Sequence, residues 1–256
     1  PWNYNGTTYY LVSGHTNKNM NGPIKNKGYW YYVENGLVVN KNTIVYFNGD
    51  WYYIHNGKLD KDYTGLVDYN GKTYYVVDGV VNHSCNGLTY INGEWCYIVN
   101  GVLDTGYNNL ILYNGTWYYV ENGKINWHYT NLVQYYGTWY YVENGKINWN
   151  KNTLCQVNGH GTWYYVENGQ INWHYQGLVY CNKEWYYIKN GVHQTNYSSL
   201  VLYNGTWYYV KNGKIDWCYT NLVQYHGTWY FVENGKINWG KNTLSQVDGH
   251  GTWYYI

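Results

Sequence analysis

The sequence of 256 residues contains no alanine and no arginine, only two prolines and one methionine, and 12% charged residues. An ordinary soluble domain has about 25% charged residues. Because alanine is the best helix former, its absence argues against a helical protein. The absence of arginine removes the side chain that binds phosphate through two parallel hydrogen bonds. The net charge of +1 gives no electrostatic footprint for nucleic acid, so we expect no nucleic-acid partner.

Long apolar runs are also missing from the sequence. None approaches the roughly 20 residues that a membrane-spanning helix needs, so we expect no membrane insertion. The first residues, Pro1-Trp2-Asn3-Tyr4, have neither the charged nor the apolar region of a signal peptide. Neither end looks like the cap of a repeat array. We therefore expect a piece of a longer secreted or surface protein, whose signal peptide is not in this chain.

Aromatic residues, glycine and asparagine are abundant instead. Aromatic side chains make up 22% of the sequence, with 39 tyrosines and 16 tryptophans, and there are 30 glycines. Tyrosine, tryptophan, valine, isoleucine and threonine favour strands, and Asn-Gly pairs favour the tight turns of β-hairpins. The composition predicts an all-β protein.

One short motif recurs along the whole chain. Trp117-Tyr118-Tyr119 has counterparts that begin at Thr8, Trp30, Trp51, Thr73, Trp95, Trp139, Trp163, Trp185, Trp207, Trp229 and Trp253. Neighbouring copies lie 21 to 24 residues apart. Periods of this length are typical of repeat architectures. We expect residues 1–256 to form a single array of about twelve units.

Each unit is expected to be a three-stranded meander. In residues 132–149, strand-forming segments are separated by Tyr136-Gly137 and Asn144-Gly145, which suit two-residue hairpin turns. The second turn predicts that Tyr140 lies opposite Trp149. Alternation places Val133, Tyr140, Val142, Ile147 and Trp149 on one face, which we expect to be the core. It places Trp139 and Tyr141 on the other face, among polar residues. Because one unit is too small to bury a core, we expect an elongated β-solenoid of stacked short β-hairpin repeats of about 22 residues.

The repeated pattern resembles a known family. The segment from Leu112-Tyr113-Asn114-Gly115 through Ile125 is similar to the cell-wall-binding repeats of Gram-positive bacteria. This group includes choline-binding modules, glucan-binding repeats of glucosyltransferases and the repetitive receptor-binding regions of clostridial toxins. The resemblance implies a hairpin solenoid without catalysis, in which aromatic residues of consecutive hairpins form shallow sites for choline or carbohydrate.

The candidate ligand-binding residues fall into three sets. The resemblance implies a site-forming role for the first tryptophan of each motif copy: Trp30, Trp51, Trp95, Trp117, Trp139, Trp163, Trp185, Trp207, Trp229 and Trp253. The second set ends an Ile-Asn-Trp or Ile-Asp-Trp segment: Trp127, Trp149, Trp173, Trp217 and Trp239. The third set is the last tyrosine of the motif, which alternation places among polar neighbours: Tyr119, Tyr141, Tyr165 and Tyr209.

Aromatic residues in such an array can bind ligands in two ways. Ring faces attract quaternary ammonium groups, and they also stack against the apolar faces of sugars. Our primary hypothesis is a non-catalytic module of a secreted or surface bacterial protein that binds cell-wall polymer or glycan at many sites. The alternative is an adhesin that binds a host surface protein such as immunoglobulin, mucin or a receptor, because tyrosine and tryptophan also dominate protein interfaces. An inert spacer is a third hypothesis.

Other chemistry has little support in the sequence. Glu121, Glu143, Glu167 and Glu233 each precede an Asn-Gly turn, which makes them cross-strand partners of lysine or glutamine rather than a catalytic pair. The five cysteines share no repeat position and have no metal-ligand spacing. We therefore expect no enzyme activity, no cofactor and no metal.

Overall fold

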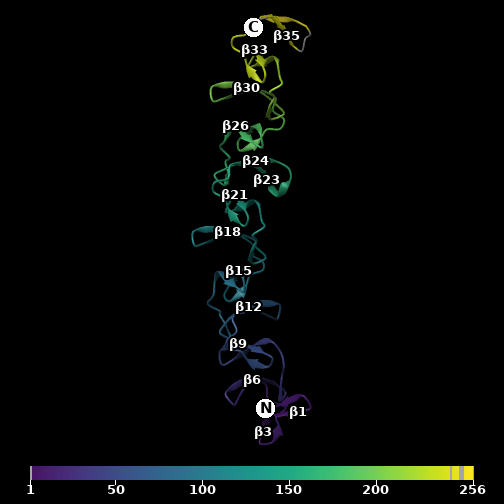
Figure 1. Ribbon diagram of the computed structural model, residues 1–256, viewed down its shortest axis with the longest axis vertical. Coiled ribbons are helices and arrows are strands. Elements are labelled where there is room, and N and C mark those ends of the chain that lie inside the picture. Colours follow the sequence, from purple (N-terminus) through teal and green to yellow (C-terminus); the bar gives the residue numbers. More distant parts are fainter. Residues whose placement is uncertain (1, 243, 248–250, 256) are drawn as a thin grey trace. The chain divides into compact units, whose positions relative to one another are not determined.

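The computed structural model describes residues 2–242, 244–247 and 251–255, and its hairpins form two compact units, Pro1–Asn126 and Trp127–Ile256 (Figure 1). The strands of the first unit are β1 (Trp2–Tyr4), β2 (Thr7–Tyr9), β3 (Leu11–Val12), β4 (His15–Thr16), β5 (Gly22–Asn26), β6 (Tyr29–Glu34), β7 (Leu37–Val38), β8 (Thr43–Phe47), β9 (Asp50–His55), β10 (Lys58–Leu59), β11 (Gly65–Tyr69), β12 (Lys72–Val77), β13 (Val80–Val81), β14 (Gly87–Ile91), β15 (Glu94–Val99), β16 (Val102–Leu103), β17 (Asn109–Tyr113), β18 (Thr116–Glu121) and β19 (Lys124–Ile125).

The second unit continues the same order of elements. Its strands are β20 (Asn131–Tyr135), β21 (Thr138–Glu143), β22 (Lys146–Ile147), β23 (Thr153–Gln156), β24 (Trp163–Glu167), β25 (Gln170–Ile171), β26 (Gln176–Cys181), β27 (Glu184–Lys189), β28 (Val192–His193), β29 (Ser199–Tyr203), β30 (Thr206–Lys211), β31 (Lys214–Ile215), β32 (Asn221–Tyr225), β33 (Thr228–Glu233), β34 (Lys236–Ile237), β35 (Leu244–Gln246) and β36 (Trp253–Tyr255), and the short 3₁₀ helix η1 (Val157–Gly159) follows β23. No helix in the described ranges is long and apolar enough to cross a membrane.

The predicted three-stranded meander is confirmed in each regular repeat. Strand β20 pairs with β21 across Tyr136-Gly137, and β21 pairs with β22 across Asn144-Gly145. All four turn residues have positive φ, at 45° and 82° in the first turn and 51° and 73° in the second. This is the backbone of a type I′ turn, which asparagine and glycine adopt most easily.

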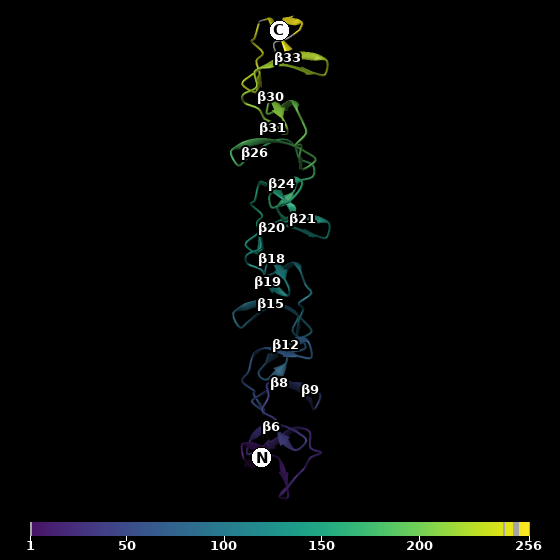
Figure 2. The ribbon, with the colours of Figure 1, turned by 90° about the vertical axis from the view of Figure 1, so that its right-hand side faces the viewer.

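Consecutive repeats are joined through the third strand. Strand β21 also pairs with β25 of the next repeat, where Tyr140 lies opposite Gln170. The amide of Tyr141 donates to the carbonyl of Gly169 at 2.8 Å. Figure 2 shows β21 and β26, which belong to hairpins two repeats apart, on opposite sides of the second unit, so the hairpins change direction along this unit. Within each unit the fold is therefore a β-solenoid of stacked hairpins, while the single array over residues 1–256 remains a prediction.

The core lies between repeats, and this corrects the predicted faces. Tyr141 was expected among polar neighbours but is only 8% exposed, whereas Trp149 was expected in the core and is 44% exposed. Tyr141 and Leu132 of one repeat form a buried cluster with Val166 and Ile171 of the next. Both faces of a hairpin are covered, because the face that carries Tyr141 packs on the opposite face of the following hairpin.

The glycine of the second turn of a repeat lies close to the backbone of the preceding repeat in this stacking. A Cβ atom on Gly169 would lie 2.5 Å from the carbonyl oxygen of Asn148 in the preceding repeat, whereas a Cβ on Gly137 would meet nothing within 4 Å. Both glycines have positive φ, which costs an L residue about 1–2 kcal/mol. We expect Gly169→Ala to destabilise the protein clearly more than Gly137→Ala in urea unfolding. Equal losses would mean that the inter-repeat contact is unimportant.

Candidate functional site

Four tryptophans of the Ile-Asn-Trp and Ile-Asp-Trp segments stand at right angles to a tyrosine. The rings of Tyr140 and Trp149, Tyr164 and Trp173, Tyr208 and Trp217, and Tyr230 and Trp239 are 5.6–5.9 Å apart with interplanar angles of 75–86°. We call each such pair a corner. Each tyrosine is the middle residue of its motif copy. The rings of Tyr140 and Trp149 are in contact, but the pairing of β21 with β22 ends at Val142 and Ile147, and the strand residue opposite Tyr140 is Gln170 of the next repeat. The tryptophans of the corners are 42–70% exposed, so one ring of each corner is open to solvent.

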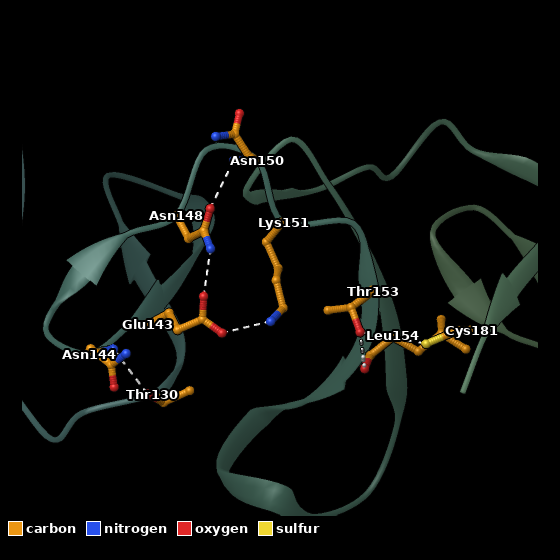
Figure 3. Close-up of polar contacts among 9 residues, drawn as sticks. All are labelled: Thr130, Glu143, Asn144, Asn148, Asn150, Lys151, Thr153, Leu154 and Cys181. Carbon is orange, nitrogen blue, oxygen red and sulfur yellow. Dashed lines mark hydrogen bonds and ion pairs between the residues drawn. The ribbon is translucent and has the colours of Figure 1, made fainter. Parts of the chain in front are cut away.

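The corners depend on the turn that carries the tryptophan. In Figure 3, Glu143 accepts hydrogen bonds from Asn148 Nδ2 at 2.6 Å and from Lys151 Nζ at 2.7 Å. Asn148 in turn accepts a bond from the amide of Asn150 at 3.0 Å. These contacts flank Trp149 on both sides in sequence. The carboxylate therefore positions the corner, and Glu143 also lies opposite Lys146, as the sequence predicts.

The hydrogen bonds to the Glu143 carboxylate make the stability of the protein depend on pH. Hydrogen bonds from Lys151 and Asn148 lower the pKa of Glu143. Because the folded-state pKa lies below the unfolded value of about 4.3, this stabilisation is present at neutral pH and is lost as the pH falls through the folded pKa. We expect Glu143→Gln to lower the free energy of unfolding at pH 7 and to have a smaller effect near pH 3, as measured by urea unfolding.

The matched control for this variant is Glu167→Gln. Glu167 accepts the same type of bond from Asn172, at 2.6 Å, but Tyr175 occupies the position that corresponds to Lys151. The loss at pH 7 should therefore be smaller for Glu167→Gln. Equal losses of unfolding free energy in the two variants would show that the ion pair with Lys151 does not stabilise the protein.

The first tryptophans of the motif have a different environment. Two are exposed, Trp163 at 39% and Trp253 at 60%. The others are half-buried: Trp30, Trp51, Trp95, Trp117, Trp139, Trp185, Trp207 and Trp229. Trp185 contacts Tyr203 of the next hairpin at 5.6 Å, and it packs on the same buried cluster as Tyr208. These tryptophans therefore join repeats, and their side chains support the tyrosine of the next corner.

The last tyrosines of the motif lie in the core. Tyr119, Tyr141 and Tyr165 are 7–9% exposed, and Tyr209 is half-buried. Burial raises the pKa of Tyr165 to about 12, so its hydroxyl stays neutral at physiological pH. The structure thus brings the second tryptophan set together with the middle tyrosines, which were assigned to the core from the sequence. Trp127 is 42% exposed, like the tryptophans of the corners.

One corner already holds a cation of the protein itself. The Nζ atom of Lys236 lies 5.6 Å from the ring centre of Tyr208 and 5.7 Å from that of Trp217. Lys236 is the residue after the Asn-Gly turn of the next repeat and lies opposite Tyr208. A cation within about 6 Å of a ring face is attracted by the ring quadrupole. The corner geometry is therefore suited to an ammonium group.

Two hollows adjoin these aromatic residues. One of about 480 Å³ includes Tyr230, Trp239 and Tyr254 in its lining, so the corner there opens into a cavity. The other, of about 580 Å³, lies beside Trp163 and Thr195. Thr195 stands where the regular repeats carry the tryptophan of a corner. With threonine at this position, the rings that line the second hollow are those of Trp163, His193 and Tyr197.

Known proteins share this repeat. A family model described as a choline-binding repeat matches residues 19–39, 40–60, 62–82, 106–126, 129–148, 150–172, 175–194, 196–216 and 219–238. Among solved structures, CbpJ from Streptococcus pneumoniae is 21% identical, with 96% of this chain and 97% of that chain covered and a TM-score of 0.33. Choline binding protein F from the same organism, solved with a peptidoglycan analogue, is 22% identical, with 96% of each chain covered and a TM-score of 0.31. The modular autolysin LytC from Streptococcus pneumoniae is 15% identical, with 85% of this chain and 52% of that chain covered and a TM-score of 0.32. No curated protein sequence matches this chain.

The family match covers more than half of the sequence and includes the tyrosine of each corner, whereas Trp149, Trp173, Trp217 and Trp239 lie just outside the matched segments. It confirms the resemblance to cell-wall-binding repeats. The chain belongs to the choline-binding repeat family.

Proposed function

We propose that this chain attaches to a bacterial cell wall by holding choline groups in the corners of its repeats. Its family makes it a cell-wall-binding module, which accounts for the repeated aromatic sites better than catalysis does. Proteins of this family are found at the surface of bacteria or are secreted by them. The observation that carries the proposal is the ammonium group of Lys236 over both rings of the Tyr208–Trp217 corner.

Choline fits a corner for physical reasons. Its quaternary ammonium carries a full positive charge but no hydrogen-bond donor, so ring faces can replace water around it. Each cation–π contact contributes about 0.5–2 kcal/mol. Two rings at right angles offer two such contacts while leaving one side open. Trp149 and Trp173 are 44% and 42% exposed, which leaves their rings accessible to a group carried on a polymer.

Many weak sites suit a polymer ligand. A single corner is expected to bind choline weakly, because two ring contacts must offset the loss of translational freedom. Linked sites on one chain can raise the overall affinity by about 10²–10⁴-fold when the ligand is also repeated. A wall polymer that carries choline along its length meets this condition.

The proposal is tested by capture on purified walls. We expect the chain to bind walls that contain choline and to be released from them by free choline. We expect it to bind poorly to walls purified from cells that were grown with ethanolamine in place of choline. Release by a soluble glucan but not by choline would instead indicate a sugar site. Capture by immobilised host serum proteins or mucin without competition by choline would overturn the proposal in favour of the adhesin hypothesis.

A further inference from the structure

In three described repeats of the second unit, the residue after the second turn lies directly opposite the corner tyrosine of the preceding repeat. Gln170 lies opposite Tyr140, Val192 opposite Tyr164, and Lys236 opposite Tyr208. These three tyrosines belong to corners of nearly equal geometry. The corners therefore differ chiefly in the side chain that the next repeat presents to them.

We infer that this residue decides which corners are available to choline. A lysine places its own ammonium over the rings and fills the corner, whereas glutamine or valine leaves it open. The inference rests on the proposed function and adds to it the residue that selects the occupied repeats. Lys236 is the filled case in the described second unit, and the Tyr140–Trp149 and Tyr164–Trp173 corners are the open cases.

The contacts of Lys236 support a role as an internal occupant. Within the described part of the chain it makes no ion pair, because the carboxylate of Glu233, its cross-strand neighbour, contacts Asn238 and Lys241 instead. The Lys236 ammonium has two aromatic rings as its neighbours. An exposed lysine that only solubilised the surface would not need to lie over both.

A second lysine at the same position shows what happens without a corner. Lys214 lies opposite Tyr186, but His193 and Thr195 replace the isoleucine and tryptophan of that repeat. The Lys214 ammonium forms an ion pair with Glu184 and lies 5.0 Å from the single ring of Tyr186. In this repeat, which has no corner tryptophan, the lysine therefore lies over one ring and pairs with a carboxylate.

The self-occupied corner should still be displaceable. A tethered group acts at an effective concentration in the millimolar range, so the lysine competes well with a weak ligand. Its ammonium is compact and strongly hydrated, and ordering its long side chain costs entropy, so a quaternary ammonium competes favourably for the rings. A corner filled for about nine-tenths of the time would bind choline roughly tenfold more weakly than an open one.

The test is a calorimetric titration of the whole chain with choline chloride. We expect Lys236→Gln to add one site, or to strengthen one about tenfold, relative to the unchanged chain. Lys236→Arg should keep the corner filled and leave the titration unchanged. Gln170→Lys and Val192→Lys should each weaken one site about tenfold or remove it from the titration. Lys214→Gln is the matched control, which removes a lysine from a repeat without a corner and should leave the number of sites unchanged.

The outcomes separate this inference from the proposed function. Suppose that the unchanged chain binds choline and that Lys236→Gln, Gln170→Lys and Val192→Lys all bind the same number of choline molecules with the same affinity. In that case the residue after the turn does not select the occupied corners, and the choline function stands. A gain of equal size in Lys214→Gln would also overturn the inference, because it would reflect net charge alone. If none of these proteins binds choline while near-UV circular dichroism shows them folded, the proposed function fails and the inference fails with it.

Discussion

Replacing Trp149, Trp173, Trp217 and Trp239 together by alanine is expected to abolish retention on choline-containing walls. Each of these tryptophans supplies the exposed ring of a corner, and each is at least 42% exposed. Losing one ring removes about 0.5–2 kcal/mol of binding free energy from each site. Because linked sites act together, weakening all of them lowers the affinity of the whole chain by a larger factor. We expect wall affinity to fall by at least about a hundredfold, measured by sedimentation of the protein with purified walls.

The matched control removes exposed aromatic rings that lie outside the corners. Tyr46, Tyr90 and Tyr180 are 59–61% exposed, and each contacts the first tryptophan of its own hairpin at 5.3–5.5 Å. Their combined replacement by alanine should leave wall binding nearly unchanged. Full retention by the tryptophan variant, or equal losses in both proteins, would contradict the assignment of the corners as binding sites.

Leu178→Ala is expected to produce the largest loss of stability. Leu178 is fully buried and forms a cluster with Tyr187 of its own repeat and Val201, Val210 and Ile215 of the next. Truncating a buried leucine costs about 2–5 kcal/mol because of lost burial and the cavity left behind. In a repeat protein this cost falls on one interface, so urea unfolding should become broader or separate into two steps.

Leu202→Ala is the comparison for this variant. Leu202 lies on strand β29, as Leu178 lies on β26, but it is 53% exposed. Its truncation should change the free energy of unfolding by less than about 0.5 kcal/mol. Similar losses for the two leucines would mean that the junction between repeats is not where the core lies.

The hairpins of the repeat could be predicted because they follow from local rules. Asn144-Gly145 has positive φ at both positions, which fixes the turn and the register of the flanking strands. This register places Val142 opposite Ile147 and Glu143 opposite Lys146, as the sequence predicts. The same register predicts that Tyr140 and Trp149 share a face, but both were assigned to the core, and the exposure of Trp149 was not predicted.

The two faces could not be told apart from one hairpin alone. Alternation separates Tyr140 from Tyr141, but it does not say which face a neighbouring repeat covers. In the solenoid both faces are covered, and Tyr141 is buried because Val166 and Ile171 of the next repeat pack on it. Leu132 lies opposite Tyr141 on the same face, and this apolar pair was the signal that the face is not a polar surface.

The role of Lys236 depends on contacts between repeats. In the sequence it is one of several residues that follow an Asn-Gly turn and face a glutamate across the hairpin. Only the pairing of β34 with β30 of the preceding repeat places its side chain over Tyr208 and Trp217. A single repeat therefore predicts the partner across the turn, while the stack determines the aromatic partner.

The central claim is that the corners hold quaternary ammonium groups, and a crystal structure of the chain grown with choline tests it most directly. We expect choline between the rings of Tyr140 and Trp149 and between those of Tyr164 and Trp173, with its ammonium within about 6 Å of both ring centres. Choline found only in the hollow beside Trp163, or absent from both corners at a concentration that saturates binding in solution, would contradict the claim.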